Sequence, residues 1–277
     1  MRIVRHRLKR DDGSDVPYRR SPNQSAGIEP ELLVLHYTAG ASAESSIAWL
    51  TDPRAQASAH VLVARDGSVT QLVPFDRRAW HAGQSRWEDR TNLNRWSFGI
   101  ELDNGGALQR RGDGWTTPWG APVDAARVVE AAHPHGGPVR GWEAFPPQQL
   151  LAAAEVATLL VRHYGLRDVV GHDEIAPGRK SDPGPAFPMQ SFRSRALGRR
   201  DPDAGAERAQ TTTALHIRTG PGTHFEKLPA SPLPAGTKLE LLGRDGDWHQ
   251  VLVLDLVAGD MDVEGWVHGR YLSPIAP

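Results

Sequence analysis

The order of apolar and polar residues predicts a first domain made of short strands and two helices. Short apolar runs between turn residues are typical of buried strands, and apolar residues three and four apart are typical of helices. By these criteria we predict strands at residues 32–37, 59–64, 68–73, 96–102 and 168–171, and helices at residues 43–50 and 147–164. An Arg-Asp-Gly turn at 65–67 joins the second and third strands into a hairpin.

Two polar residues interrupt this apolar pattern. His36 lies near the end of the first strand, and Glu101 lies in the fourth strand, on the side opposite Phe98 and its alternate neighbours. A buried imidazole or carboxylate needs a partner. Each residue is therefore either a satisfied core group or part of a functional site, because sites in mixed sheets gather at strand ends.

Three later stretches follow other patterns. Residues 104–147 are rich in Gly, Pro and Trp, and only 123–132 fit a helix. Residues 191–210 are charged and poor in apolar side chains, which is typical of a linker. Residues 211–277 alternate apolar and polar positions between Pro-Gly and Asp-Gly turns, which predicts a separate small β-barrel.

The composition of the chain argues against several kinds of partner and location. The 32 basic and 33 acidic residues nearly balance, which argues against nucleic acid or an anionic membrane surface as a partner. No apolar run approaches the roughly 18 residues of a membrane span. The basic residues 1–10 are followed by Asp11, Asp12 and Asp15 rather than by an apolar segment. We therefore expect no signal peptide, and either a cytoplasmic protein or one exported without a cleaved leader.

The chain contains no cysteine, so any metal must be held by His, Asp or Glu. His172 and Asp182 lie in a loop that Pro177, Gly178, Pro183 and Gly184 prevent from forming one helix, so they meet only if the loop folds back. The plain interpretation is a surface loop with a salt bridge.

A third ligand would turn this pair into a metal site. With His36, the loop offers two nitrogens and one oxygen, which leaves one tetrahedral position for water. This is the pattern of catalytic rather than structural zinc. Hydrolysis also needs a base and a cation, and Glu101 and Lys180 suit these roles. Lys180 is otherwise a solvated turn residue.

Five motifs make the first domain recognisable. Residues 171–187 read Gly-His-Asp-Glu-Ile-Ala-Pro-Gly-Arg-Lys-Ser-Asp-Pro-Gly-Pro-Ala-Phe, and shorter motifs occur at residues 34–38, 58–60, 79–83 and 99–102. Together they resemble, in order, the motifs of the type 2 (AmpD-like) N-acetylmuramoyl-L-alanine amidases. The resemblance spans about residues 30–190. It implies an α/β fold with a mixed central β-sheet flanked by helices.

The resemblance also implies the chemistry. His36, His172 and Asp182 would bind one zinc ion, Glu101 would handle the attacking water, and Lys180 would lie beside the scissile carbonyl. The reaction would be hydrolysis of the amide between N-acetylmuramic acid and L-alanine in peptidoglycan or muropeptides. Further side chains are expected to line the substrate groove or to support the ligands from behind: His60, Trp80, His81 and Trp142.

Other possibilities remain open at this point. A peptidoglycan-recognition protein would keep the fold and bind muropeptides without cutting, but in that class a ligand is typically replaced. His133 and His135 fit either a second metal or, as we favour, a loop at the groove mouth. We expect a monomer.

The C-terminal segment has its own resemblance. Residues 215–222, 246–251 and 265–272 resemble the motifs of a bacterial SH3-like domain, over about residues 211–274. Such domains often bind the cell wall, although a barrel that only stabilises the first domain is the alternative. The expected organisation is an amidase domain at 1–190, a linker at 191–210 and an SH3-like domain at 211–277.

Overall fold

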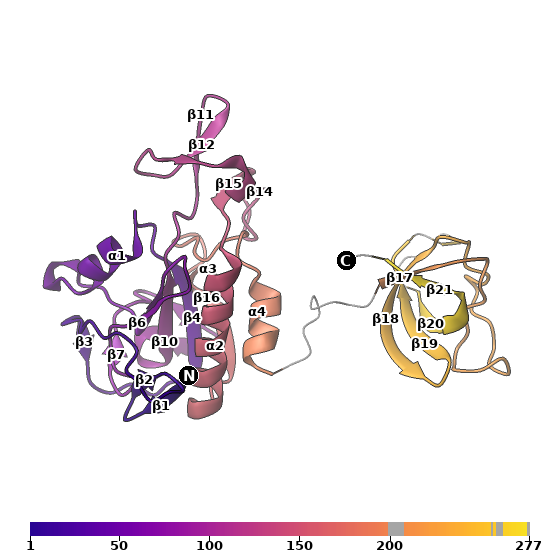
Figure 1. The fold of residues 1–277 in the computed structure, drawn as a ribbon, viewed down its shortest axis with the longest axis horizontal. Coiled ribbons are helices and arrows are strands. Elements are labelled where there is room, and N and C mark those ends of the chain that lie inside the picture. The colour runs from indigo at the N-terminus through magenta and orange to yellow at the C-terminus, as the bar shows by residue number, and fades with distance from the viewer. Residues whose placement is uncertain (199–207, 256, 259–262, 276–277) are drawn as a thin grey trace. The chain divides into compact units, whose positions relative to one another are not determined.

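A computed structural model describes residues 1–198, 208–255, 257–258 and 263–275 (Figure 1). Contacts within the chain divide it into two units, Met1–Arg200 and Asp201–Pro277. None of the described helices has the length and apolar character that crossing a membrane requires.

A five-stranded mixed sheet forms the centre of the first unit. Its order is β16-β4-β10-β5-β6, and the strands are β4 (Leu32–Tyr37), β5 (Val61–Val63), β6 (Val69–Gln71), β10 (Ser97–Leu102) and β16 (Asp168–Gly171). The four strands from β16 to β5 run parallel, and β6 returns antiparallel to β5. The predicted strands and the hairpin are thus confirmed. Because parallel strands end at the same edge, residues that follow β4, β10 and β16 gather there.

Helix α2 (Pro147–Tyr164) covers one face of this sheet. Pro147 at its start needs no hydrogen-bond partner for its nitrogen, and Gly165 ends the helix in the left-handed conformation. Ala153, Val156 and Leu160 join the alternate strand residues of this face in one core cluster. Truncating a fully buried leucine such as Leu160 costs about 2–5 kcal/mol, so this contact holds the sheet in place.

The opposite face of the sheet packs against loops and short helices. Leu32, Val34 and Val170 form a second cluster there with Ile175 of α3 (His172–Ile175). Strand residues alternate between faces, so His36 and Glu101 belong to this second face. Helix α1 (Ala43–Leu50) forms as predicted, and Ser42 caps its start.

A protruding segment, Gly105–Pro146, leaves the sheet after β10 and returns at α2 (Figure 1). It contains β11 (Gln109–Arg111), β12 (Gly114–Thr116), β13 (Pro122–Val123), β14 (Val128–Ala131) and β15 (Arg140–Glu143). The helix predicted over 123–132 is therefore wrong, apart from the single turn η3 (Ala125–Arg127). Strand β14 pairs antiparallel with β15, so that Val129 lies opposite Trp142, and this partner could not be read from the local sequence.

Ion pairs fix the base of the protruding segment. Glu143 is 3% exposed and accepts from Arg65 and from the exposed Arg127, while Arg65 also reaches Asp103 at 2.6 Å. Removing one partner of a buried pair leaves an uncompensated charge, so these contacts hold β15 against the end of the sheet. Gly106 allows an equally close approach, because a Cβ there would lie 2.3 Å from the Tyr37 ring.

The predicted linker begins later than expected. Residues 191–196 belong to helix α4 (Met189–Ala196), whose Phe192 and Ala196 are buried in the main core cluster. Two apolar side chains one helical turn apart were enough to dock this charged segment. Residues 199–207 of the predicted linker lie outside the described part of the chain.

Short strands and turns complete the first unit. They are β1 (Arg2–Val4), β2 (Arg7–Lys9), β3 (Gln24–Ser25), β7 (Arg78–Ala79), β8 (Arg86–Trp87) and β9 (Arg90–Thr91), with the 3-10 turns η1 (Pro53–Ala55) and η2 (Leu93–Arg95).

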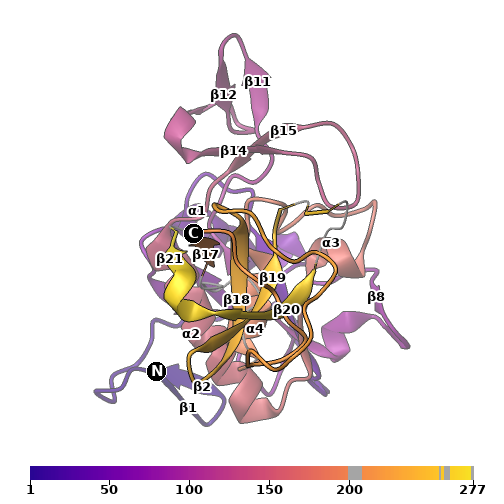
Figure 2. The same cartoon turned by 90° about the vertical axis from the view of Figure 1, so that its right-hand side faces the viewer.

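The second unit contains an antiparallel five-stranded sheet with the order β20-β19-β18-β17-β21 (Figure 2). Its elements are β17 (Arg208–Thr211), β18 (Lys238–Asp245), β19 (Trp248–Val253), β20 (Glu264–His268) and β21 (Leu272–Pro274), with the turn η4 (Gly269–Tyr271). Ile217, Leu239 and Val251 belong to its own apolar cluster. The alternating pattern of 211–277 thus reflects an antiparallel sheet with one buried face.

Candidate metal centre

Three side chains converge at the carboxyl edge of the central sheet. His36 is on β4, His172 starts α3 directly after β16, and Asp182 comes from the following loop. The two Nδ1 atoms lie 2.8 Å apart, and Asp182 Oδ2 lies 3.0 Å from His36 Nδ1 and 2.9 Å from His172 Nδ1. All three residues are buried. Their ligand atoms lie close enough to share one metal ion.

The loop folds back as its Pro and Gly residues require. The Asp173 amide donates to the Asp182 carbonyl at 2.8 Å, and the Lys180 amide donates to the Ala176 carbonyl at 3.0 Å. These bonds return Asp182 to the start of α3, beside His172. The prediction that the pair meets only through loop reversal is confirmed.

The hydrogen bonds behind the imidazoles determine where their protons lie. His172 Nε2 lies 3.2 Å from the Ala82 carbonyl, which can only accept, so the proton is on Nε2. His81 Nε2 likewise faces the Ser97 carbonyl at 3.3 Å, which leaves His81 Nδ1 to accept from His36 Nε2 at 3.0 Å. Both Nδ1 atoms of the cluster therefore present lone pairs.

The electrostatics agree with this assignment. Burial, followed by the neighbouring His172, lowers the pKa of His36 to about 4, so its imidazole is neutral at pH 7. Burial acts to raise the pKa of Asp182, but its close contacts with the imidazoles of His172 and His36 outweigh burial and hold the pKa well below the ordinary value. Two lone pairs and one carboxylate thus face each other without a proton between them. This donor set fits a cation that takes nitrogen and oxygen ligands.

Glu101 lies beside this cluster. Its Oε2 atom is buried and has no hydrogen-bond partner among the described residues. Burial, and then the charge of Asp182, raises the pKa of Glu101 to about 8, while Lys180 opposes the rise. A carboxyl group whose pKa lies near neutrality can take up and return a proton at working pH. Glu101 also lines a hollow of about 310 Å³ beside α1.

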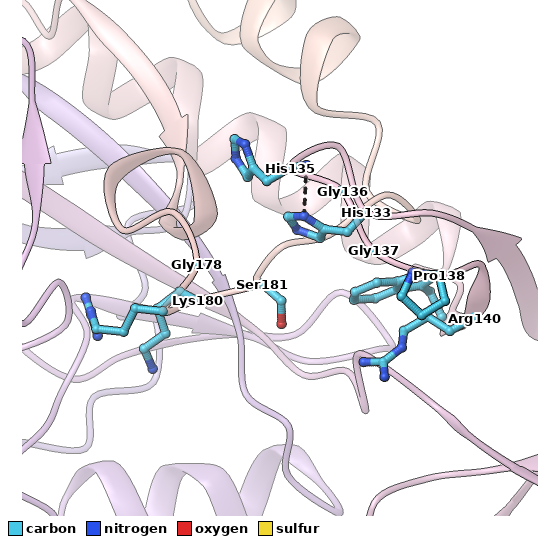
Figure 3. Close-up of a pocket in the computed structure, with 11 residues that line it drawn as sticks. His133, His135, Gly136, Gly137, Pro138, Arg140, Gly178, Lys180 and Ser181 are labelled. Atoms are coloured by element: carbon cyan, nitrogen blue, oxygen red, sulfur yellow. Dashed lines mark hydrogen bonds between the residues drawn. The ribbon is translucent and has the colours of Figure 1, made fainter.

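Lys180 lines a second hollow, of about 420 Å³, between its loop and the protruding segment (Figure 3). Its positive charge acts to lower the pKa of both His36 and Glu101. It forms no ion pair within the described ranges. The site thus combines a metal-binding cluster, a carboxyl group and a free cation.

Comparison with known proteins identifies the family that uses this arrangement. Residues 26–185 match the sequence profile of the N-acetylmuramoyl-L-alanine amidases. The chain belongs to this family. It is an N-acetylmuramoyl-L-alanine amidase that acts on peptidoglycan or muropeptides. An amidase is therefore the better interpretation than a protein that only binds muropeptides. The residues that could hold a metal ion, His36, His172 and Asp182, are all present.

Individual relatives support the same assignment. N-acetylmuramoyl-L-alanine amidase AmiD of Escherichia coli is 34% identical over 85% of this chain and 72% of its own length. The 1,6-anhydro-N-acetylmuramyl-L-alanine amidase AmpD of Salmonella typhimurium is 32% identical over 66% of this chain and 92% of its own. A crystal structure of a selenomethionine AmpD derivative superposes with a TM-score of 0.51 at 28% identity, over 70% of this chain and 99% of that one. The α/β fold with a mixed sheet is confirmed.

The amidase uses the histidines of the shorter motifs in different ways. His60 is fully buried: its Nδ1 accepts from the Gly99 amide and its Nε2 donates to the Arg77 carbonyl, each at 3.0 Å. It has no exposed surface for a substrate, so of its two predicted roles the burial favours support of the site from behind, where its ring lies beside that of His81. His81 stands behind His36 and orients that ligand, which fits the supporting role rather than the substrate-lining role.

The two tryptophans that were expected to line the groove, Trp80 and Trp142, have different surroundings in the structure. Trp80 is half-buried, and its Nε1 donates to Ser25 Oγ at 3.2 Å. Trp142 lies at the floor of the 420 Å³ hollow, with its Nε1 donating to the Ala131 carbonyl at 3.0 Å. His133 and His135 line the same hollow, and His133 Nε2 lies 3.1 Å from Asp173 Oδ2.

Sequence reasoning missed the residues that build the second layer of the amidase site. Asn94 Oδ1 accepts from the amides of His81 and Ala82 at 2.9 and 2.7 Å, and so fixes the loop that orients both ligand histidines. Gly99 lets His81 approach, because a Cβ there would lie 2.6 Å from the His81 ring. Gly99 falls within a recognised motif, but nothing in the local pattern around Asn94 marks it.

Proposed function

We propose that the amidase is zinc-dependent and hydrolyses the amide between the lactyl group of N-acetylmuramic acid and L-alanine. The observation that carries this proposal is the meeting of three proton-free donors, His36 Nδ1, His172 Nδ1 and Asp182 Oδ2. When bound there, zinc supplies Lewis acidity, which polarises the scissile carbonyl and makes water acidic enough to attack near pH 7.

The surrounding side chains have distinct roles in this proposal. Glu101 takes a proton from the attacking water and returns it to the departing amine, which its raised pKa favours. Lys180 stabilises the negative charge that develops on the carbonyl oxygen. His81 keeps His36 in the tautomer that presents Nδ1 to the metal.

The substrate and the second unit complete the proposal. A soluble muropeptide is a suitable substrate, because the Salmonella typhimurium relative is named for its 1,6-anhydro-muramyl substrate. We assign residues 1–190 to catalysis and 211–277 to an SH3-like barrel that binds the cell wall, joined by a segment within 191–210. The separate apolar cluster and antiparallel sheet of the second unit support such an independent module.

The proposal is tested with the full chain, by metal analysis together with mass spectrometry of products from a muramoyl-peptide. We expect one zinc per chain, and free peptide beginning with L-alanine. His36→Ala and Asp182→Ala should each lose both the zinc and the activity, because two protein ligands rarely hold zinc well. An exposed histidine of α2 provides the control, and His163→Ala should keep both. Full activity of the Asp182 variant would remove that residue from the site.

A further inference from the structure

The hollow beside Lys180 has a consistent positive lining. One wall is the loop that leads to Asp182, and the other is the end of the protruding segment (Figure 3). Two arginines, one lysine and two histidines line it, and none of its lining residues is acidic: His133, His135, Gly136, Gly137, Pro138, Arg140, Trp142, Gly178, Arg179, Lys180 and Ser181. Such a lining attracts an anionic part of a ligand.

In the described part of the chain, Arg140, like Lys180, is an unpaired cation of this hollow. Its side chain is exposed, and no residue that the structure describes forms a hydrogen bond or ion pair with it. Arg179, in contrast, already donates to the carbonyls of Ala82 and Gln84 at 2.9 and 2.6 Å. A guanidinium group matches the two oxygens of a carboxylate, so Arg140 is suited to bind one.

Ser181 lines the same hollow as Arg140, and its hydroxyl group contacts that of Tyr37. Tyr37 Oη and Ser181 Oγ share one hydrogen bond of 2.9 Å, so one of their two protons remains free to donate. Figure 3 shows the side chains of Arg140, Ser181 and Lys180 pointing to the same side.

The strand that carries Arg140 is held rigidly. Arg140 begins β15, and Glu143 at the end of this strand is fixed by Arg65 and Arg127. On the other side of the hollow, His133 lies against Asp173 of α3 at 3.1 Å. These contacts on both sides of the hollow fix the backbone that carries Arg140, while its side chain stays exposed to a ligand.

The hollow of about 310 Å³ beside α1 suggests which end of the substrate lies where. It is lined by hydroxyl groups and an exposed tryptophan, and contains no cation: Thr38, Ala39, Gly40, Ser45, Ser46, Trp49, Leu50 and Glu101. Ser46 Oγ is buried there without a partner in the described structure. An uncharged sugar suits this lining, which leaves the charged peptide for the hollow that contains Arg140.

We infer that Arg140, together with the hydroxyl pair of Tyr37 and Ser181, binds a free carboxylate of the peptide stem and makes the enzyme selective for acidic stems. The inference rests on the proposed function, because it assumes that the scissile amide lies at the metal cluster beside Lys180. The first carboxylate after L-alanine belongs to the second stem residue. Arg140 is a specificity residue in this scheme and takes no part in bond cleavage.

A matched pair of substrates tests the inference. N-acetylmuramoyl-L-alanyl-D-glutamine and N-acetylmuramoyl-L-alanyl-D-glutaminamide differ only in whether the α-carboxyl group of the second residue is a free carboxylate or a carboxamide. We expect the full-length enzyme to prefer the acid in kcat/KM by about tenfold, the effect of one charge-assisted hydrogen-bonded pair. Arg140→Ala should abolish this preference through KM and leave the amide substrate unchanged. Arg140→Lys should retain part of it.

A control variant separates local from general effects. Arg111→Ala removes an exposed arginine from the same protruding segment but not from the hollow, so the preference should remain. An equal loss on both substrates in Arg140→Ala, or an unchanged preference, would overturn the inference. If the wild-type enzyme cleaves neither substrate, the proposed function fails instead. Calorimetric binding of the same two compounds to wild type and Arg140→Ala then decides the role of Arg140.

Discussion

Glu101 on β10 lies directly opposite His36 on β4 in the parallel register of the central sheet. The two residues share one face and one edge of the sheet, so the carboxyl group stays beside the metal cluster without any loop to position it. This pairing follows from two strands that the sequence predicts well. It makes the relation between the proposed base, Glu101, and the proposed ligand, His36, a property of the sheet itself.

This relation predicts the behaviour of a Glu101 variant. Glu101→Ala should keep its zinc, because the three ligands do not depend on this side chain, but should lower kcat by about 10² or more if Glu101 is the base. Zinc content and kcat measured on the same sample check both parts. A rate close to that of wild type would leave Glu101 as a structural acid.

A second prediction concerns His81, which contacts the ligand His36 but not the metal cluster. His81→Ala should weaken zinc binding by about 10–100-fold, because the proton on His36 Nε2 loses its acceptor. Competition with a chelator measures this affinity. His81→Gln offers a carbonyl oxygen in its place and should recover part of it.

The backbone beside His81 provides an independent test of the same contact. Gly99→Ala should also weaken zinc binding, since its methyl group would lie 2.6 Å from the His81 ring. Gly114 lies in an open position of the protruding segment, where the nearest atom to an added Cβ is 4.0 Å away, so Gly114→Ala is the matched control. Equal zinc affinity in the two glycine variants would contradict this account of His81.

Buried His60 predicts how stability depends on pH. Burial lowers its pKa from 6.5 to about 4, so between these values the unfolded chain binds a proton that the folded chain does not. His60 should therefore reduce the free energy of unfolding as pH falls from 7 to 4, by about 3 kcal/mol at most.

Urea titrations across this pH range measure the effect. The free energy of unfolding should depend less steeply on pH in His60→Gln. His163→Gln, at an exposed position of α2, should leave this pH dependence unchanged. An NMR titration in which the His60 imidazole becomes protonated near pH 6.5 in the folded protein would contradict the prediction.

If the second unit binds the cell wall, its deletion should affect intact walls and soluble muropeptides differently. Deleting residues 205–277 should weaken binding to intact cell walls and spare the hydrolysis of small soluble muropeptides, because the ligands, Glu101 and Lys180 all lie in the first unit. Sedimentation with purified walls and turnover of a soluble substrate check the two parts. Equal losses in both assays would make the second unit a stabilising element.

The sequence allowed the metal cluster to be predicted because its residues follow strong local patterns. An apolar run leads to His36, and the Pro and Gly residues around Asp182 require a reversal. The structure of 123–132 could not be predicted in this way, because Val128 and Val129 fit a helix or a strand until β15 pairs with them. Similarly, His60 and His81 occur in equally recognisable motifs, and only their contacts separate a core residue from a ligand support.

The ion pairs around Glu143 connect the protruding segment to Arg65, near the end of β5, and not to any of the three ligands. In the proposed scheme, Arg140 selects the peptide from β15, whereas His36 on β4 and His172 after β16 hold the metal together with Asp182. A replacement hairpin that kept Glu143 and the close approach of Gly106 to Tyr37 would give the enzyme a new choice of peptide while its reaction stayed the same.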